Sequence, residues 1–162
     1  MFADYTTDAY AIAMTSLIAP SKPAIVLYGA TGNGRDLAPR IAARLGVGIT
    51  ADCTGLEIDD ERQLIQTRPA FGGNIMAEIY TPARRPQMAT VRPNVFKPAE
   101  PDRSRTGEIE KADITISPVQ IRTRVLEKVS EVVEGMKSVE EADVIVCSGR
   151  GIKDPANLEL PK

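Results

Sequence analysis

The fold is decided by the stretch from Ala24 to Leu45, which reads AIVLYGATGNGRDLAPRIAARL. Its first five residues form a short continuous apolar run, which is typical of a strand buried on both faces of a parallel sheet. A glycine-rich turn follows over Gly29–Gly34. The remaining residues place Leu37 and Ile41 on one face of a helix that ends at Leu45. A strand, a glycine turn and a helix in this order predict a doubly wound, Rossmann-like α/β domain.

The pattern changes on either side of this unit. A helix over Thr6–Ile18 is expected before it, because Thr6 or Thr7 can cap the helix and the prolines at 20 and 23 end it. Alternating residues predict a strand over Ile49–Ile58, with a hairpin loop at Asp59–Arg62. Three further strand candidates with short connections predict antiparallel additions to the sheet, and they cover residues 63–69, 73–80 and 86–93.

The last third of the chain predicts the beginning of a second α/β domain. Prolines and charges over 98–110 indicate an exposed linker, so we assign residues 1–97 to a first domain and 111–162 to a second. The expected elements of the second domain are a strand at 112–116, a helix at 122–137 and a buried strand at 142–147. A turn at Ser148–Gly151 and the beginning of another helix follow.

Composition excludes several classes of function. The chain has 162 residues, a net charge of -2 and no histidine, which excludes Ser-His-Asp and Cys-His catalysis and makes a zinc site improbable. The charge balance and the scarcity of aromatic residues give no support for a nucleic-acid partner. No apolar run is long enough to insert into a membrane. Two distant cysteines suit a reducing compartment, namely the cytoplasm, or the mitochondrial matrix in a eukaryote.

Three motifs could bind a ligand or a partner. Gly29–Gly34 could hold a phosphate at a helix N-terminus, although its spacing also fits a plain strand-to-helix turn. Ser148–Gly151 offers Arg150 to an anion, and an ordinary turn is the alternative. The loop Arg68–Asn74 could line a partner surface or the edge of a cofactor, or it could be a bulge that requires glycine. Arginine-proline pairs at 68, 85 and 92 add positive charge.

Taken together, these stretches resemble the alpha subunits of electron transfer flavoproteins. The similarity covers Gly34–Leu45, Thr50–Thr54, Thr67–Ala77 and Arg85–Pro93, in the family's order and spacing. The resemblance implies a heterodimer with a beta subunit and electron exchange with flavin-dependent dehydrogenases such as acyl-CoA dehydrogenases. It implies a flavin adenine dinucleotide (FAD) on the alpha C-terminal domain. In electron-bifurcating members the beta subunit carries a second flavin.

The resemblance also assigns residues. Ser148, Gly149, Arg150 and Gly151 match the family's flavin-contacting stretch, with serine in place of its first glycine. The alpha N-terminal domain docks on the beta subunit in this family, and Gly29–Gly34 becomes a structural turn. The residues expected at the interface with the beta subunit are Arg68, Phe71, Gly72, Gly73, Asn74 and Arg92.

Family members begin with further β/α units and continue past residue 162 with more flavin-binding loops. We therefore expect a fragment of such a subunit that binds FAD weakly or not at all. Its sheet would have an open apolar edge, so the isolated chain should oligomerise or require a partner. Two alternatives remain open: a non-redox scaffold that keeps only beta-subunit docking, and a small nucleotide-binding protein that uses Gly29–Gly34.

Overall fold

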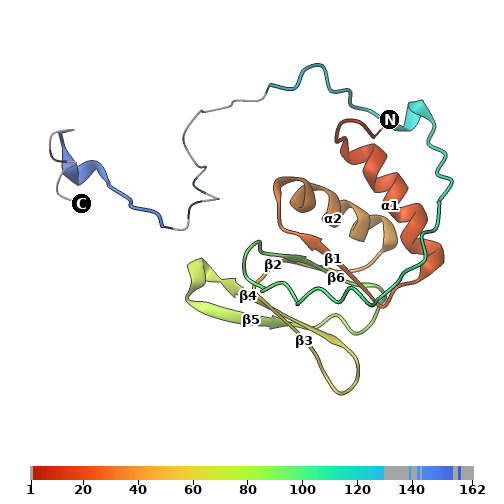
Figure 1. Cartoon of the computed structure of the whole chain (residues 1–162), viewed down its shortest axis with the longest axis horizontal. Helices are drawn as coiled ribbons and strands as arrows, with labels where there is room; N and C mark the ends of the chain where they lie inside the picture. Colours follow the sequence, from red (N-terminus) through yellow and green to blue (C-terminus); the bar gives the residue numbers. More distant parts are fainter. Residues whose placement is uncertain (1, 130–138, 140–141, 143, 155–156, 158–162) are drawn as a thin grey trace. The chain divides into compact units, whose positions relative to one another are not determined.

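The computed structural model describes residues 2–129, 139, 142, 144–154 and 157. The chain divides into two units, Met1–Leu126 and Glu127–Lys162. The regular elements of the first unit (Figure 1) are α1 (Thr7–Ser21), β1 (Ile25–Gly29), α2 (Gly32–Leu45), β2 (Ile49–Cys53), β3 (Gly55–Ile58), β4 (Leu64–Ala70), the 3-10 turn η1 (Phe71–Gly73), β5 (Ile75–Ile79), β6 (Gln87–Val91) and the 3-10 turn η2 (Pro118–Gln120). The second unit contains the 3-10 turn η4 (Arg150–Ile152).

A parallel sheet in the order β1-β6-β2 is the centre of the first unit. β6 is parallel to both neighbours, so the prediction that residues 86–93 add an antiparallel strand is wrong. The side chains of four consecutive β6 residues are at most 1% exposed, which is the burial of a central parallel strand. Two of them are polar and are satisfied by neighbouring strands. Gln87 Oε1 accepts from the Leu64 amide at 2.8 Å, and Thr90 Oγ1 accepts from the Asp52 amide at 2.8 Å.

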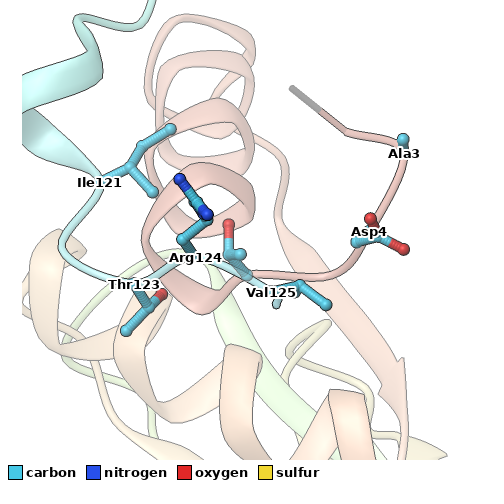
Figure 2. A pocket seen from close by; sticks show the side chains of 7 residues that line it. Ala3, Asp4, Ile121, Thr123, Arg124 and Val125 are labelled. Atoms are coloured by element: carbon cyan, nitrogen blue, oxygen red, sulfur yellow. The ribbon is translucent and has the colours of Figure 1, made fainter. Parts of the chain in front are cut away.

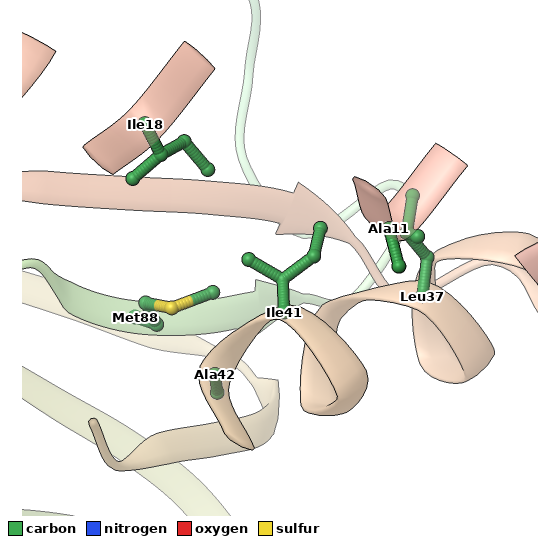
Figure 3. Close-up of a cluster of buried hydrophobic side chains, with 6 residues drawn as sticks. All are labelled: Ala11, Ile18, Leu37, Ile41, Ala42 and Met88. Atoms are coloured by element: carbon green, nitrogen blue, oxygen red, sulfur yellow. The ribbon is translucent and has the colours of Figure 1, made fainter. Parts of the chain in front are cut away.

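Both helices cover one face of this sheet, and the main core lies between them and the strands (Figure 3). α2 presents the predicted face, with Leu37 and Ile41 buried, while Met88 of β6 approaches from the sheet. α1 contributes Ala11 and Ile18 and continues through Pro20 to Ser21, three residues beyond the predicted end. These contacts fix α2, and with it the glycine turn, above the carboxyl ends of the strands.

An antiparallel sheet in the order β3-β4-β5 lies on the other side of the parallel sheet (Figure 1). The stretch predicted as one strand, Ile49–Ile58, is divided at Thr54 between the two sheets. Asp52 has a φ of 61°, and the pairing of β2 with β6 shifts register between Thr50 and Cys53, so the chain changes direction there. The hairpin loop at Asp59–Arg62 is confirmed by the Arg62 amide, which donates to the Asp59 carbonyl at 3.0 Å. The antiparallel additions are confirmed for β4 and β5.

The chain after β6 differs from the prediction. Residues 93–113 are exposed and irregular, and residues 112–116 do not form a strand. Ile114 and Ile116 pack on Ala9 and Ala13 of α1, so this segment lies against a helix instead of a sheet edge. Residues 122–129 are not helical, and the rest of the predicted helix lies outside the described residues.

The strand predicted at 142–147 is not found in its described part, and residue 143 lies outside it. Val144 and Val146 are 80% and 70% exposed. An apolar run forms a strand only where a neighbouring strand and a core accept it, and the described residues of this unit provide neither. No helix within the described part of the chain is long and apolar enough to cross a membrane.

Candidate functional site

Two arginines bind one carboxylate at the carboxyl edge of the parallel sheet. Asp52 lies near the end of β2, Arg92 directly follows β6, and Arg35 lies in the first turn of α2. Arg92 Nη2 is 2.6 Å from Asp52 Oδ2, and Arg92 Nε donates to Oδ1 at 3.3 Å. Arg35 Nη2 donates to the same Oδ1 at 3.1 Å. Parallel strands place their carboxyl ends on one edge, where α/β folds bind their ligands.

Asp52 stays ionised in this arrangement. The hydrogen bonds from Arg92, together with the attraction of Arg92, Arg35 and Arg68, lower the pKa of the Asp52 carboxyl below its usual range. The same hydrogen bonds raise the pKa of Arg92. A carboxylate held this firmly is unsuited to general acid–base work near neutral pH. Asp52 therefore acts as an anchor that positions two guanidinium groups.

The predicted loop Arg68–Asn74 closes the β4–β5 hairpin beside this cluster. Phe71, Gly72 and Gly73 have φ values of 48°, 70° and 92°, a left-handed run that glycine tolerates and phenylalanine rarely adopts. Asn74 Nδ2 donates to the Phe71 carbonyl at 3.1 Å and braces the turn. The Phe71 ring is 82% exposed. Gly72 and Gly73 thus allow the backbone to form the turn, which is the structural role considered as the alternative to binding. The same turn exposes the Phe71 ring to solvent.

The predicted interface residues are brought together. A hollow of about 370 Å³ is lined by Arg68, Pro69, Ala70, Phe71, Gly72, Gly73 and Arg92. Five of the six residues predicted for a partner interface therefore line one surface, and Asn74 supports it from the turn. Arg68 Nε donates weakly to the Pro69 carbonyl at 3.4 Å, and no carboxylate pairs with Arg68 among the residues that the structure describes.

The glycine turn after β1 has a packing role. Thr31 Oγ1 accepts from the Gly34 amide at 3.2 Å and caps α2. A Cβ on Gly34 would lie 1.9 Å from the Gly29 carbonyl oxygen, so only glycine fits there. Because Thr31 already uses the Gly34 amide, this turn has fewer donors to offer a phosphate.

The predicted flavin-contacting residues lie in the second unit. Arg150 begins η4, and the Ile152 amide donates to the Gly149 carbonyl at 3.1 Å. All four residues, Ser148–Gly151, are exposed, and a Cβ on either glycine would meet no atom within 4 Å. The described residues contain no cluster of side chains able to hold a metal ion.

Sequence reasoning missed a second charged cluster, centred on Asp8. This carboxylate is 3% exposed, and Arg122 donates to it from its amide, Nε and Nη2 at 3.1 Å each. Arg40 also pairs with it. These bonds lower the pKa of Asp8 well below the usual range, Arg122 contributing most. Its partners are 32 and 114 residues away, so no local pattern could reveal them.

The Asp8 cluster fastens the segment after η2 to α1. Beside it, a shallow hollow of about 260 Å³ lies between the N-terminal segment and residues 121–125 (Figure 2). Its lining includes Asp4, Thr123 and Arg124. The loose collection of side chains in Figure 2 shows no convergence on a common point, so we assign this hollow no binding role.

Comparison with known proteins relates this chain to a single family. Residues 1–117 match the family model described as the electron transfer flavoprotein domain. The electron transfer flavoprotein subunit alpha of Thermoanaerobacterium thermosaccharolyticum is 51% identical over 162 residues, which is all of this chain and 49% of the relative. That of Megasphaera elsdenii is 49% identical over 149 residues, 91% of this chain and 44% of the relative.

A third relative is the lactate dehydrogenase (NAD(+),ferredoxin) subunit LctC of Acetobacterium woodii. It is 42% identical over 156 residues, 96% of this chain and 37% of the relative. The chain thus spans about half the length, or less, of the curated relatives it matches.

Proposed function

This chain belongs to the electron transfer flavoprotein domain family, and from that premise we propose that it works as part of an alpha subunit that docks on a beta subunit. The heterodimer would carry electrons between flavin-dependent dehydrogenases and an acceptor. The observation that carries the proposal is the surface formed by the Arg68–Asn74 loop and Arg92. It combines an exposed aromatic ring, a hollow and positive charge, which are features of the residues that dominate protein interfaces.

FAD would be the electron-carrying group of such a heterodimer, and the protein would supply its position and its electrostatic surroundings. Ser148–Gly151 offers FAD one guanidinium and glycine amides that a phosphate could approach closely. These residues are exposed and cannot enclose a dinucleotide by themselves. We therefore assign them a contact with FAD that requires further groups to become a binding site.

The names of the relatives suggest two kinds of electron-transfer system in which this chain could work. The names of two of them refer to electron transfer flavoproteins, and the third is a subunit of a ferredoxin-linked lactate dehydrogenase. We propose a cytoplasmic carrier, served by acyl-CoA dehydrogenases or by an electron-bifurcating dehydrogenase. A non-redox scaffold is the second candidate, because the residues proposed for docking lie in the first unit and those proposed to contact FAD lie in the second.

The first test is substitution at the docking surface. In the complete heterodimer, Arg68→Ala and Phe71→Ala should weaken subunit association or slow the reduction of the beta-subunit flavin, because each removes an interface group. Titration calorimetry and stopped-flow absorbance measure these two effects. Unchanged affinity together with unchanged flavin kinetics would show that the surface has another purpose.

The second test separates carrier from scaffold. The visible absorbance of the purified chain is recorded alone and after addition of the beta subunit. A colourless chain that binds the beta subunit would favour the scaffold. A yellow chain with a flavin spectrum would show that this stretch binds flavin without help.

A further inference from the structure

The tip of the β4–β5 hairpin, residues Ala70–Met76, exposes three large apolar side chains. Phe71, Ile75 and Met76 are 82%, 54% and 56% exposed. Single exposed apolar residues are normal on protein surfaces, whereas a projecting turn is usually polar. Ile75 and Met76 are consecutive in β5, so their side chains point to opposite faces of the hairpin. The hairpin tip therefore presents apolar groups at its end and on both faces.

One of these faces is buried at its base and uncovered at its tip. Leu64 and Gln66 of β4 are 3% and 0% exposed. Arg68 and Ala70 continue the same face, because alternate residues of a strand share a face. Ile75 is paired with Ala70 and therefore belongs to it as well. The hairpin thus extends beyond the elements that cover its base (Figure 1).

Positive charge exceeds negative charge beside the hairpin tip. Asp52 binds Arg35 and Arg92, and its field also reaches Arg68. Arg68 forms no ion pair in the described part of the chain. Asp52 thus pairs with two of the three guanidinium groups, and the third, that of Arg68, lies on the same face as Ile75. A partner that supplies a carboxylate at this point would complete the cluster.

We propose that the hairpin tip is an arm held on both faces by a cleft of the partner protein, whose walls are apolar and whose rim carries a carboxylate for Arg68. The proposal rests on the proposed function, because it takes the beta subunit as that partner. A second copy of this chain is a poor occupant, since a symmetric contact would bring the unpaired Arg68 beside the tip of each copy close to the other's, and the two charges would repel each other. A flat, one-sided interface would leave either Ile75 or Met76 in water.

The two faces can be tested separately by titration calorimetry with the beta subunit. Ile75→Ser and Met76→Ser should each weaken association at least about 10-fold, because each face loses a buried apolar contact. The matched control is Ile58→Ser, since Ile58 is 57% exposed in the same sheet but at its opposite end, and its affinity should stay within about 2-fold. Far-UV circular dichroism checks that every variant is folded. An effect from only one of Ile75 and Met76 would refute the two-sided arm.

The carboxylate is tested by salt dependence. The affinity of the unsubstituted chain should fall with rising salt, and Arg68→Gln should both weaken binding and flatten this dependence. Arg103→Gln, in the exposed segment after β6, should change neither. Unchanged affinity of Ile75→Ser and Met76→Ser beside weakened binding by Arg68→Gln would overturn the arm and leave the proposed function standing. Absence of binding by the unsubstituted chain would overturn both. A dimer of this chain that Ile75→Ser dissociates would assign the tip to a second copy.

Discussion

Gly34→Ala tests the close approach that determines how α2 leaves the parallel sheet. A Cβ on Gly34 would lie 1.9 Å from the Gly29 carbonyl oxygen and 3.1 Å from its carbon. Contacts of this kind are essentially never shorter than 3.0 Å, so the helix start and the strand end must separate by about 1 Å. The atom in the way is backbone and cannot rotate aside. The shift therefore strains both the end of β1 and the Thr31 cap.

The expected cost follows from two opposing effects. Overpacking against fixed atoms costs roughly 3 kcal/mol, at the upper end of the usual range, because the obstruction is backbone. Alanine is favoured over glycine within a helix by about 1 kcal/mol, which offsets part of this. The net loss is therefore about 2 kcal/mol in the free energy of unfolding. With a urea dependence of about 2 kcal/mol per molar, the unfolding midpoint should fall by about 1 M.

Gly32→Ala is the matched control. Gly32 begins the same helix, has no left-handed φ, and its added Cβ would meet no atom within 4 Å. It should raise the midpoint slightly, because alanine reduces the entropy of the unfolded chain. Both midpoints are read from far-UV circular dichroism, since the chain has no tryptophan. Equal midpoints for the two variants would refute the packing role and return the turn to the phosphate-binding interpretation. Stabilisation of the unsubstituted chain by a nucleotide would do the same.

Two further predictions concern the Asp8 cluster and the core. Asp8→Asn should accelerate tryptic cleavage after Arg122 at least about 10-fold without changing cleavage after Arg103, because among the described residues Arg122 hydrogen-bonds only to Asp8 while Arg103 is already exposed. Equal rates at Arg122 in the variant and the unsubstituted chain would contradict this. Arg122 and Arg40 lower the pKa of Asp8. The ionised carboxylate therefore stabilises the fold fully above the ordinary carboxyl pKa of about 4, and this stabilisation is lost as the pH falls below that value. Between about pH 5 and pH 3, the urea midpoint of Asp8→Asn should thus decline less steeply than that of the unsubstituted chain. Ile41→Ala should cost about 3 kcal/mol in urea unfolding, since Ile41 is fully buried, whereas Leu17→Ala, at a 38% exposed position of α1, should cost under about 1 kcal/mol.

The sequence predicts those parts of the fold whose pattern is local. The run before Gly29 and the face with Leu37 and Ile41 determine β1 and α2 within 22 consecutive residues. The sequence predicts β6 as a strand but with the wrong direction, because its residues, Gln-Met-Ala-Thr-Val, do not form the apolar run of a buried parallel strand. Its burial depends on Gln87 and Thr90 finding hydrogen-bond partners in β4 and β2, which only the assembled sheets provide.

The candidate site also contains some residues that the sequence predicts and others that only the folded structure identifies. The residue types of the Arg68–Asn74 loop single it out, the family resemblance assigns it to the interface with the beta subunit, and the structure brings Arg68, Phe71 and the glycines together with Arg92. Asp52 was not singled out, because a lone acidic residue within a strand carries no pattern. Its importance comes from Arg92, which is 40 residues away. The assignments of Ser148–Gly151 to FAD and of the domain boundaries stay predictions.

The bend at Asp52 explains the position and the charge of the surface that we propose for docking. The left-handed φ of Asp52 breaks the register with β6 and directs the chain out of the parallel sheet into β3. The antiparallel sheet then places the β4–β5 hairpin beside Arg92. The same residue supplies the carboxylate that pairs with Arg92 and Arg35 and leaves Arg68 unpaired. If the arm hypothesis is correct, Asp52→Asn should therefore strengthen the attraction of this surface for an acidic partner at low salt while loosening its geometry. Faster association and faster dissociation of the beta subunit would show both effects, whereas slower association would refute the role of Asp52 as the charge that the arginines share.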